Sequence, residues 1–339
     1  MTPEPAIPDR PPQPPRYDVF NGDADGICAL HQMRLAEPAE AHLVTGVKRD
    51  IALLQRVPSG LPHPPRVLVL DVSLDANAAD LRRLLDDGAQ VDYFDHHTAA
   101  QRFDHPGLRL HWNEAPDMCT SLLVDRYLGG RHRRWAAVAA FGDNLATQGR
   151  ALGEQCGLAP DAVAVLERLG QVLNYNAYGD CVEALHIAPA ALYRALSRYE
   201  DPFDFIAGSS HYRDLCDGYD DDCSHLQRLR PYWQKPGGEI YLLPAEPWAR
   251  RVSGVLANRL AARQAGDAFA ILSMHADGTF VVSVRSGAPV ERSACGLCEQ
   301  FAGGGGRRAA AGINQLPAAD LPLFIARFSQ YFGLESHAG

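Results

Sequence analysis

The residues best suited to catalysis are three neighbours, Asp95, His96 and His97, which follow the apolar segment 91–94. Together they offer one anionic oxygen ligand and two neutral nitrogen ligands. That mixture suits a borderline divalent transition metal such as Mn²⁺ better than the all-oxygen shells of Ca²⁺ and Mg²⁺. Because such a triplet also arises by chance, it indicates a metal site only if other segments supply further ligands.

Three more aspartates follow apolar segments in the same way. Asp71 ends the most hydrophobic run of the first half, and Asp23 and Asp25 lie in a glycine-flanked turn after another run. The glycines permit a tight backbone with both carboxylates on one side. Asp25 could simply cap the next helix, but a cap does not explain two carboxylates. An unpaired charge at Asp71 would be costly, so this residue needs a metal or a basic partner.

Alternating strands and helices must position these aspartates. The apolar patterns predict strands at 17–20, 42–47, 66–71 and 89–94, and helices at 27–35 and 78–87. This β-α-β alternation predicts a parallel sheet with right-handed crossovers. Ligands of such sheets collect at the carboxyl ends of the strands, so we expect the aspartates to share that edge.

A further aspartate comes from the mainly helical stretch 120–199. Its apolar helix 135–141 ends at Gly142-Asp-Asn144, where Asp143 either caps the helix or adds a ligand. The five aspartates with His96 and His97 could bind two divalent cations bridged by a carboxylate. Such a pair stabilises the attacking water and the leaving oxygen in phosphoryl transfer. The residues therefore predict hydrolysis of a phosphoester.

Length and composition limit the function class. A chain of 339 residues predicts two domains. Residues 1–16 are Pro-rich, lack a signal-peptide core and are expected to be a disordered tail, and a cytoplasmic location is the expectation. The eight cysteines are expected to be reduced thiols. A net charge of −9 disfavours tight binding of long nucleic acid but permits a short phosphorylated ligand.

The second half predicts a smaller α+β domain. Residues 201–236 are rich in Asp, Gly and Pro and are expected to connect the domains. After them we expect a hairpin that turns at Ala276-Asp-Gly278, and a glycine loop within 303–312. The expected strands are 239–243, 268–274 and 279–285, and the expected helices are 252–263, 292–301 and 318–332.

Four segments resemble, in order, the motifs of the DHH phosphoesterase superfamily: Phe20-Asn-Gly-Asp-Ala-Asp-Gly26, Val69-Leu-Asp71, Asp95-His-His97 and Gly142-Asp-Asn144. Val282-Ser-Val-Arg-Ser286 and the glycine run resemble the domain associated with that family. The resemblance covers nearly everything from Tyr17 to Phe332. It implies an α/β chain: an N-terminal parallel-sheet DHH domain (17–200), a helical connection (201–236) and a smaller α+β substrate-binding domain (237–339).

The resemblance also implies roles for single residues. The metal ligands would be Asp23, Asp25, Asp71, Asp95, His96 and Asp143. Asp95, His96 and His97 would be catalytic, with His97 beside the scissile phosphate as ligand support or proton donor. The second domain would hold the nucleotide through the planar guanidinium of Arg285 and through backbone N–H groups of glycines. The substrate-binding residues would be Arg285, Ser286, Gly304, Gly305, Gly306, Arg307 and Arg308.

Two positions depart from the family pattern. Several branches carry a His four residues before the first motif aspartate, where this chain has Val19. RecJ-type members also lack it, so one metal site would be weaker or completed differently. Many members also have a His after the glycine run, where this chain has Arg307. An Arg holds phosphate but does not match the stacking of an imidazole, so substrate preference does not transfer from those branches.

We therefore expect an Mn²⁺-dependent phosphodiesterase, with two ions and with Co²⁺ or Mg²⁺ as alternatives. Its substrates would be short oligonucleotides, linear or cyclic dinucleotides, or 3′-phosphonucleotides. The expected partners include no long duplex nucleic acid and no membrane, and a homodimer is compatible with the sequence. The alternatives are a RecJ-like exonuclease on longer single strands, an inorganic pyrophosphatase and a non-catalytic nucleotide sensor.

Overall fold

The computed structural model describes residues 14–100, 102–263, 266–275, 277–287, 292–306 and 308–334. The chain folds as two compact units. Unit 1 contains the described residues up to Gly170 together with Pro189–Phe205, and unit 2 contains Gln171–Ala188 and the described residues from Ile206 onward. These bounds differ from the predicted ranges, because the segment around residue 180 belongs with the later part of the chain. The tail predicted at 1–16 lies mostly outside the described residues.

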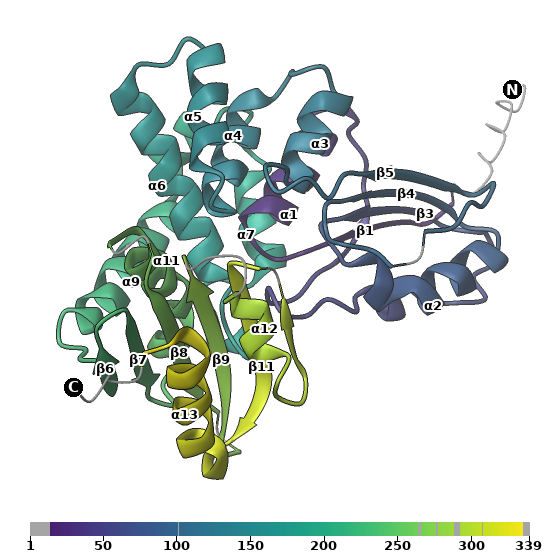
Figure 1. Cartoon of the computed structure of the whole chain (residues 1–339). Coiled ribbons are helices and arrows are strands. Elements are labelled where there is room, and N and C mark those ends of the chain that lie inside the picture. Colours follow the sequence, from purple (N-terminus) through teal and green to yellow (C-terminus); the bar gives the residue numbers. More distant parts are fainter. Residues whose placement is uncertain are drawn as a thin grey trace, which may run out of the picture. The chain divides into compact units, whose positions relative to one another are not determined.

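Unit 1 is built on a parallel sheet of five strands in the order β2-β1-β3-β4-β5 (Figure 1). The parallel α/β architecture predicted from the sequence is confirmed. The second strand is shorter than predicted, and the edge strand β5, half exposed and alternating in polarity, was not predicted. The strands are β1 (Arg16–Phe20), β2 (His42–Val44), β3 (Arg66–Leu70), β4 (Gln90–Asp95) and β5 (Leu108–Trp112).

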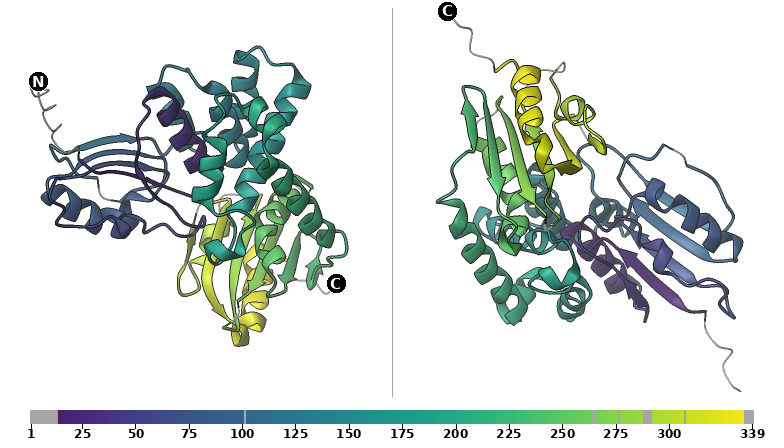
Figure 2. Two further views of the ribbon diagram at one scale, coloured as in Figure 1. Left: turned by 180° about the vertical axis from the view of Figure 1, so that it is seen from behind. Right: turned by 90° about the horizontal axis from the view of Figure 1, so that it is seen from below.

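The crossover helices cover the sheet. Helix α2 (Leu74–Asp86) lies along one face, as Figures 1 and 2 show, and buries Leu81, Leu84 and Leu85 against that face's Val and Tyr side chains. Helix α1 (Ala24–Ala36) follows β1 directly and is buried along most of its length. Between β2 and β3 the chain forms a short 3₁₀ turn, η1 (Leu54–Arg56).

The remaining helices of the first half confirm the mainly helical stretch 120–199. Small residues let them pack closely: a Cβ on Gly170 would lie 2.2 Å from the Val138 carbonyl oxygen. The helix predicted at 135–141 is α4 and does end beside Asp143. The elements are α3 (Thr120–Tyr127), α4 (Arg133–Gly142), α5 (Ala146–Gln155), α6 (Pro160–Asn176), η2 (Val182–Ala184) and α7 (Pro189–Leu196).

Residues 201–236 are largely helical, as predicted, but from Ile206 onward they belong to unit 2 rather than connecting two domains. They form α8 (Pro202–Gly208), α9 (Ser210–Leu226) and the short strand β6 (Trp233–Lys235). Most acidic residues of α9 occupy the exposed side of the helix, whose Leu215 and Tyr219 are buried.

Unit 2 contains a mixed sheet of six strands in the order β10-β11-β9-β8-β7-β6. Strands β7 and β8 pair in parallel and the other pairs are antiparallel, including the predicted hairpin β8–β9. Residue 276 in its turn lies outside the described residues. The further strands are β7 (Gly238–Leu243), β8 (Ala268–Met274), β9 (Thr279–Ser286), β10 (Gly304–Gly306) and β11 (Ala310–Pro317).

Helices pack on both faces of this sheet. Leu256 and Leu260 of α11 belong to one apolar cluster, and Phe324 and Phe328 of α13 belong to the other. The helix predicted at 292–301 is reduced to one turn. The elements are α10 (Pro247–Arg251), α11 (Ser253–Arg263), α12 (Ala294–Cys298), η3 (Ala318–Asp320) and α13 (Leu321–Phe332).

The glycine run is a strand rather than the predicted loop. Gly304–Gly306 form the edge strand β10, which pairs with β11. The next glycine along, Gly312, has a structural reason, because a Cβ there would lie 2.6 Å from the Val282 carbonyl oxygen of β9. The small residues therefore allow two backbones to approach closely.

Two further properties bear on the sequence predictions. Across the described residues, we find no helix that combines the length and apolar character needed to cross a membrane. All eight cysteines are free thiols.

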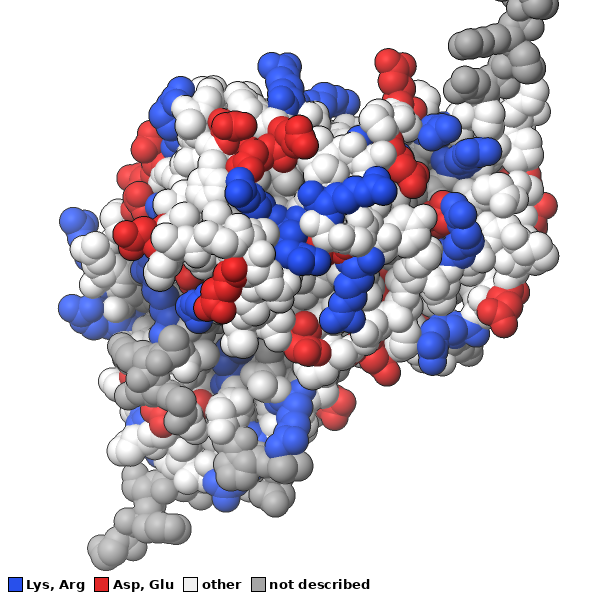
Figure 3. Space-filling view, turned by 90° about the horizontal axis from the view of Figure 1, so that it is seen from above, with Lys and Arg blue, Asp and Glu red and all other residues white. Residues whose placement is uncertain are grey.

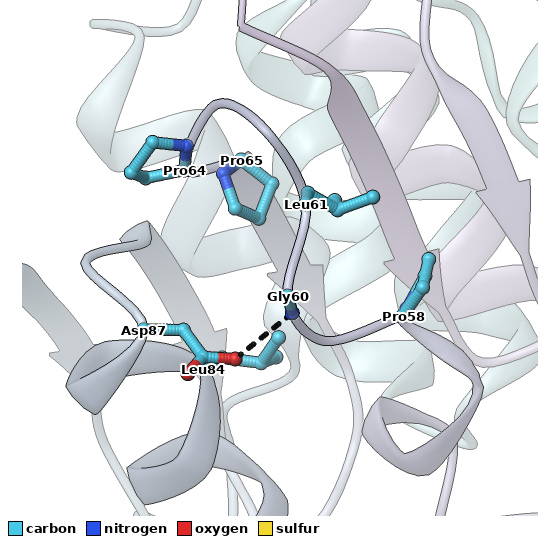
Figure 4. Close-up of a pocket in the computed structure, with 7 residues that line it drawn as sticks. All are labelled: Pro58, Gly60, Leu61, Pro64, Pro65, Leu84 and Asp87. Carbon is cyan, nitrogen blue, oxygen red and sulfur yellow. Dashed lines mark hydrogen bonds between the residues drawn. The ribbon is translucent and has the colours of Figure 1, made fainter.

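A surface pocket lies at the amino ends of the parallel strands (Figure 4). It is lined by Pro58, Gly60, Leu61, Pro64, Pro65, Leu84 and Asp87, and the Gly60 N–H donates to Asp87 Oδ2 across 3.4 Å. The pocket precedes β3, whereas Asp71 follows that strand. It is therefore far along the sheet from the predicted site and offers a single carboxylate.

Candidate metal centre

Asp23 and Asp25 stand at the start of α1, directly after β1. Asp23 caps the helix: its Oδ1 accepts the backbone N–H groups of Asp25 (3.0 Å) and Gly26 (3.1 Å). Asp25 therefore does not serve as the cap. Its carboxylate instead accepts the N–H groups of Thr120 and Ser121, both at 2.7 Å, at the start of α3.

Asp71 follows β3 in a strained backbone conformation. Its φ is 59°, in the left-handed region that few residues other than glycine adopt. Its N–H still continues the sheet by donating to the Phe94 carbonyl oxygen at 3.0 Å. The side chain is held by the Thr120 hydroxyl, which donates to Oδ1 at 3.2 Å. Such strain is typical of functional positions, because the surrounding structure must maintain it.

The Asp95-His96-His97 triplet ends β4. Asp95 Oδ1 accepts the backbone N–H of His96 (2.9 Å) and of His97 (3.3 Å), and it lies 2.7 Å from His97 Nδ1. The other oxygen, Oδ2, is buried and has no hydrogen-bond partner within the described structure. The Trp112 indole on β5 donates to the His97 carbonyl oxygen at 2.8 Å, which fixes the backbone of the triplet.

His96 is the point at which the four motifs converge. Its Nε2 lies 3.4 Å from Asp71 Oδ1, 3.9 Å from Asp143 Oδ2 and 4.0 Å from Asp25 Oδ2. Asp143 reaches this position from the carboxyl end of α4. The predicted gathering of the aspartates at one sheet edge is therefore what the structure shows.

Crowding of carboxylates in a buried place raises their pKa values. Burial, and then the neighbouring Asp71, raise the pKa of Asp25 to about 7. Burial and the charge of Asp23 raise the pKa of Asp71 to about 6. Burial likewise raises the pKa of Asp143. Burial and mutual repulsion therefore disfavour the charged forms of these carboxylates when no cation is bound.

At the two histidines and at Asp23, the neighbouring groups favour the charged form. Burial disfavours a charge on His96, but the hydrogen bond to Asp71 and the surrounding carboxylates outweigh it and raise its pKa to about 10. Burial is likewise outweighed at His97, where Asp95 raises the pKa. At Asp23, the Lys48 ammonium and the Gly26 N–H outweigh burial and lower the pKa.

These residues fit a divalent cation. One ligand atom each from Asp71, His96 and His97 lie within 4.8 Å of one another. Asp95 Oδ2 is a buried acceptor without a described hydrogen-bond donor, and a bound cation would satisfy it. The donor set combines oxygen and nitrogen, as borderline transition metals prefer.

The predicted substrate residues lie in unit 2. Arg285 is on β9, and burial lowers the pKa of its guanidinium; its described side-chain hydrogen bond goes to the Val284 carbonyl oxygen at 3.1 Å. The Ser286 hydroxyl donates to the Arg292 carbonyl oxygen at 3.1 Å. The Gly304 N–H donates to the Phe301 carbonyl oxygen, so it is not free to bind an anion as predicted. Arg308 follows β10, and Arg307 lies outside the described residues.

Comparison with solved structures gives the fold. An exonuclease RecJ bound to manganese superposes with a TM-score of 0.63 at 23% identity, covering 95% of this chain and 91% of that one. RecJ from Thermus thermophilus in complex with Mn²⁺ gives 0.62 at 21%, over 95% of this chain and 52% of that one. A pGpG-specific phosphodiesterase, PggH from Vibrio cholerae, gives 0.53 at 15%, over 95% and 100%.

The chain has the RecJ-like fold of the DHH phosphoesterases. No family model matches the sequence, and no curated protein does either. The two-domain α/β arrangement expected from the motifs is confirmed at the level of this DHH-type fold.

Within the DHH-type fold, sequence reasoning missed Lys48 and Thr120. Lys48 follows β2, and its ammonium pairs with Asp23 and lies 4.0 Å from Asp143. Its place after a predicted strand was the available signal, because that strand ends at the same sheet edge. Thr120 bonds both Asp25 and Asp71 from the start of α3 and carried no signal of its own.

We expect the metal-free protein to lose stability as the pH rises. The pKa values of Asp25 and Asp71 in the folded protein are higher than the ordinary value of 3.8. Their protonation therefore stabilises the folded protein at low pH, and this stabilisation is lost as the pH rises to about 7. His96 acts in the same direction, since its stabilising proton is lost between 6.5 and about 10. Thermal melting in a chelator should show a falling midpoint from about pH 4 to 10, flatter in Asp25→Asn below pH 7. A rising midpoint would contradict these charge assignments.

Proposed function

We propose that this protein is a DHH-family phosphodiesterase that uses a divalent cation, preferably Mn²⁺, to hydrolyse short nucleotides. The observation that carries the proposal is the convergence of Asp25, Asp71 and Asp143 on His96, beside the unpartnered oxygen of Asp95. A buried cluster of this composition is expensive to maintain without a cation. Solved structures with the same fold were obtained with manganese.

The residues proposed to hold divalent cations are Asp23, Asp25, Asp71, Asp95, His96 and Asp143. When bound, such a cation acidifies a water molecule and neutralises charge that develops on the phosphate. The chain's own contribution is orientation: the Thr120 and Ser121 amides hold Asp25, and Asp95 holds His97.

His97 is suited to donate a proton to the leaving oxygen. Its Nδ1 faces Asp95 at 2.7 Å, which directs Nε2 away from the carboxylate. The side chain is 36% exposed, whereas that of His96 is 3% exposed. Asp95 raises the pKa of His97 against the effect of burial and so favours the protonated imidazole, the form that can supply that proton.

We propose that unit 2 binds the nucleotide through Arg285, Ser286, the glycine strand 304–306 and the arginines 307–308. Arg285 supports this best, because a half-buried guanidinium with no described carboxylate partner favours a phosphate. The hydroxyl of Ser286 and the N–H of Gly304 already donate hydrogen bonds to backbone carbonyl oxygens within unit 2. These two residues would therefore shape the site rather than bind phosphate.

The substrate class is proposed to be short nucleotides: oligonucleotides of a few residues, linear or cyclic dinucleotides, or 3′-phosphonucleotides. The net charge of −9 disfavours a long polyanion and favours neither a duplex nor a membrane as partner. The likeness to a pGpG-specific phosphodiesterase over the whole of that chain also supports a small substrate.

A RecJ-like exonuclease acting on longer single strands is the second candidate. Two observations favour it: the RecJ structure gives a higher TM-score than PggH, and basic side chains gather in the middle of the face shown in Figure 3, with acidic ones around them. A non-catalytic nucleotide sensor is the remaining alternative.

A chain-length series separates these functions. With Mn²⁺ present, we expect kcat/KM to be highest for dinucleotides or oligonucleotides of a few residues and to fall at least about tenfold for a 24-mer. Cyclic dinucleotides and pyrophosphate run beside the series would identify the narrower class. Activity confined to the 24-mer would favour the exonuclease, and binding without release of mononucleotide would indicate a sensor.

A further inference from the structure

Lys48 places a fixed positive charge inside the carboxylate cluster. Its ammonium pairs with Asp23 Oδ2 and lies 4.0 Å from Asp143 Oδ1. The side chain is only 26% exposed and that of Asp23 is 3% exposed, so solvent screens this contact weakly. An ion pair of this kind is not a loose surface contact.

Contacts between two loops hold the backbone of Lys48 close to Asp23. The Asn21 amide donates to the Lys48 carbonyl oxygen at 3.3 Å, which joins the loop after β2 to the loop after β1. The same two loops touch at the glycines, because a Cβ on Gly22 would lie 2.0 Å from the Gly46 carbonyl oxygen. Moving the ammonium away from Asp23 would therefore require the side chain alone to swing out.

The oxygens of the cluster are unequally satisfied. Asp23 Oδ1 accepts two helix N–H groups and Oδ2 accepts Lys48, so this carboxylate already has strong partners on both oxygens. Asp95 Oδ2 has no described partner. We call Asp25, Asp71, Asp95, His96 and His97 the histidine half of the cluster, and Asp23 and Lys48 the lysine half. Asp143 lies between them, 3.9 Å from His96 and 4.0 Å from Lys48.

We propose that the Lys48 ammonium takes the place of a second divalent cation in the lysine half, so that the protein binds one divalent cation tightly, in the histidine half. This inference rests on the proposed function and revises the two ions expected from the sequence. A second cation would have to displace the ammonium from Asp23 or bind beside a like charge.

The arrangement also divides the work of the site. An ammonium donates hydrogen bonds to anionic oxygens but cannot acidify a water molecule as a divalent cation does. Lys48 would therefore bind a phosphate oxygen of the substrate, and the nucleophile would arise in the histidine half. On β1, which leads to Asp23, Val19 is fully buried and offers no further ligand.

Counting bound Mn²⁺ tests the inference without any measurement of turnover. Isothermal titration calorimetry on the full chain should give one tight ion, and electron paramagnetic resonance of the loaded protein should show a magnetically isolated Mn²⁺. In Lys48→Met a second ion should bind about 10- to 100-fold more tightly than in the parent, with a spin-coupled signal. Lys48→Arg should keep one tight ion, and Lys235→Met serves as the matched control at the protein's other lysine.

A second variant guards against misfolding. Asp23→Asn in the parent background should leave the tight ion in place, and circular dichroism should report the fold of each variant. Two ions of similar affinity in the parent, one ion in a folded Lys48→Met, or no tight ion at all would each overturn the proposal. Two tight ions together with turnover would refute only the role of Lys48, whereas one tight ion without turnover would refute only the proposed hydrolysis.

Discussion

Asp95→Asn should reduce kcat by at least about 10³-fold, or roughly 4 kcal/mol of transition-state stabilisation, while the protein stays folded. Asparagine retains an oxygen that can accept the N–H groups of His96 and His97. The substitution removes the buried negative charge on Oδ2 that a cation needs and weakens the hydrogen bond that orients His97. Steady-state hydrolysis of a dinucleotide with Mn²⁺ measures the loss, and thermal melting in chelator should show no large decrease in stability.

Asp92→Asn is the matched control. Asp92 is on the same strand, but it is partly exposed and pairs with Arg109 at the surface. An exposed pair of this kind contributes little to stability, so activity and melting should stay close to those of the parent. If Asp95→Asn kept activity within about tenfold of the parent, the metal centre assigned here would be wrong.

Gly22→Ala should destabilise the protein by about 3 kcal/mol and lower its melting midpoint by roughly 6 °C or more. The new Cβ would stand 2.0 Å from the Gly46 carbonyl oxygen and 2.7 Å from Pro189 Cγ, so a backbone segment must move. The segment on one side carries Lys48 and the one on the other carries Asp23, and activity should fall with stability. Urea or thermal unfolding of the variant measures the effect.

Gly305→Ala is the control for that stability measurement. A Cβ on Gly305 meets no heavy atom within 4 Å and the residue has no left-handed φ. Its unfolding free energy should therefore change by less than about 1 kcal/mol. Equal losses in both variants would mean that the effect is a general response to glycine replacement and not the close approach of two loops.

Much of the first unit follows from its sequence. The runs before Asp23, Asp71 and Asp95 are apolar and short, and a buried parallel strand has that composition. Asp143 could be placed because its apolar helix ends at a glycine. The strand β5 was missed because Leu108, Leu110 and Trp112 alternate with polar residues on a half-exposed edge, a weak pattern next to the buried runs.

The details of the site depend on contacts between distant segments, which local pattern cannot supply. Lys48 gains its role only when β2 pairs with β1 and brings its loop beside Asp23. The amides that hold Asp25 come from residues 120 and 121. The left-handed backbone of Asp71 likewise has no local cause, because the structure around it maintains that strain.

The position of the ligands at the ends of parallel strands bears on how the protein folds. Neighbouring parallel strands are joined by crossovers that must be complete before the strands can pair, and such non-local pairing is slow. The predicted ligands follow β1, β3 and the helix α4 or end β4, so they are brought together only when the sheet and its helices have assembled. A cation bound at this edge would stabilise the finished fold and slow its unfolding, and it would give no assistance to the early steps of folding.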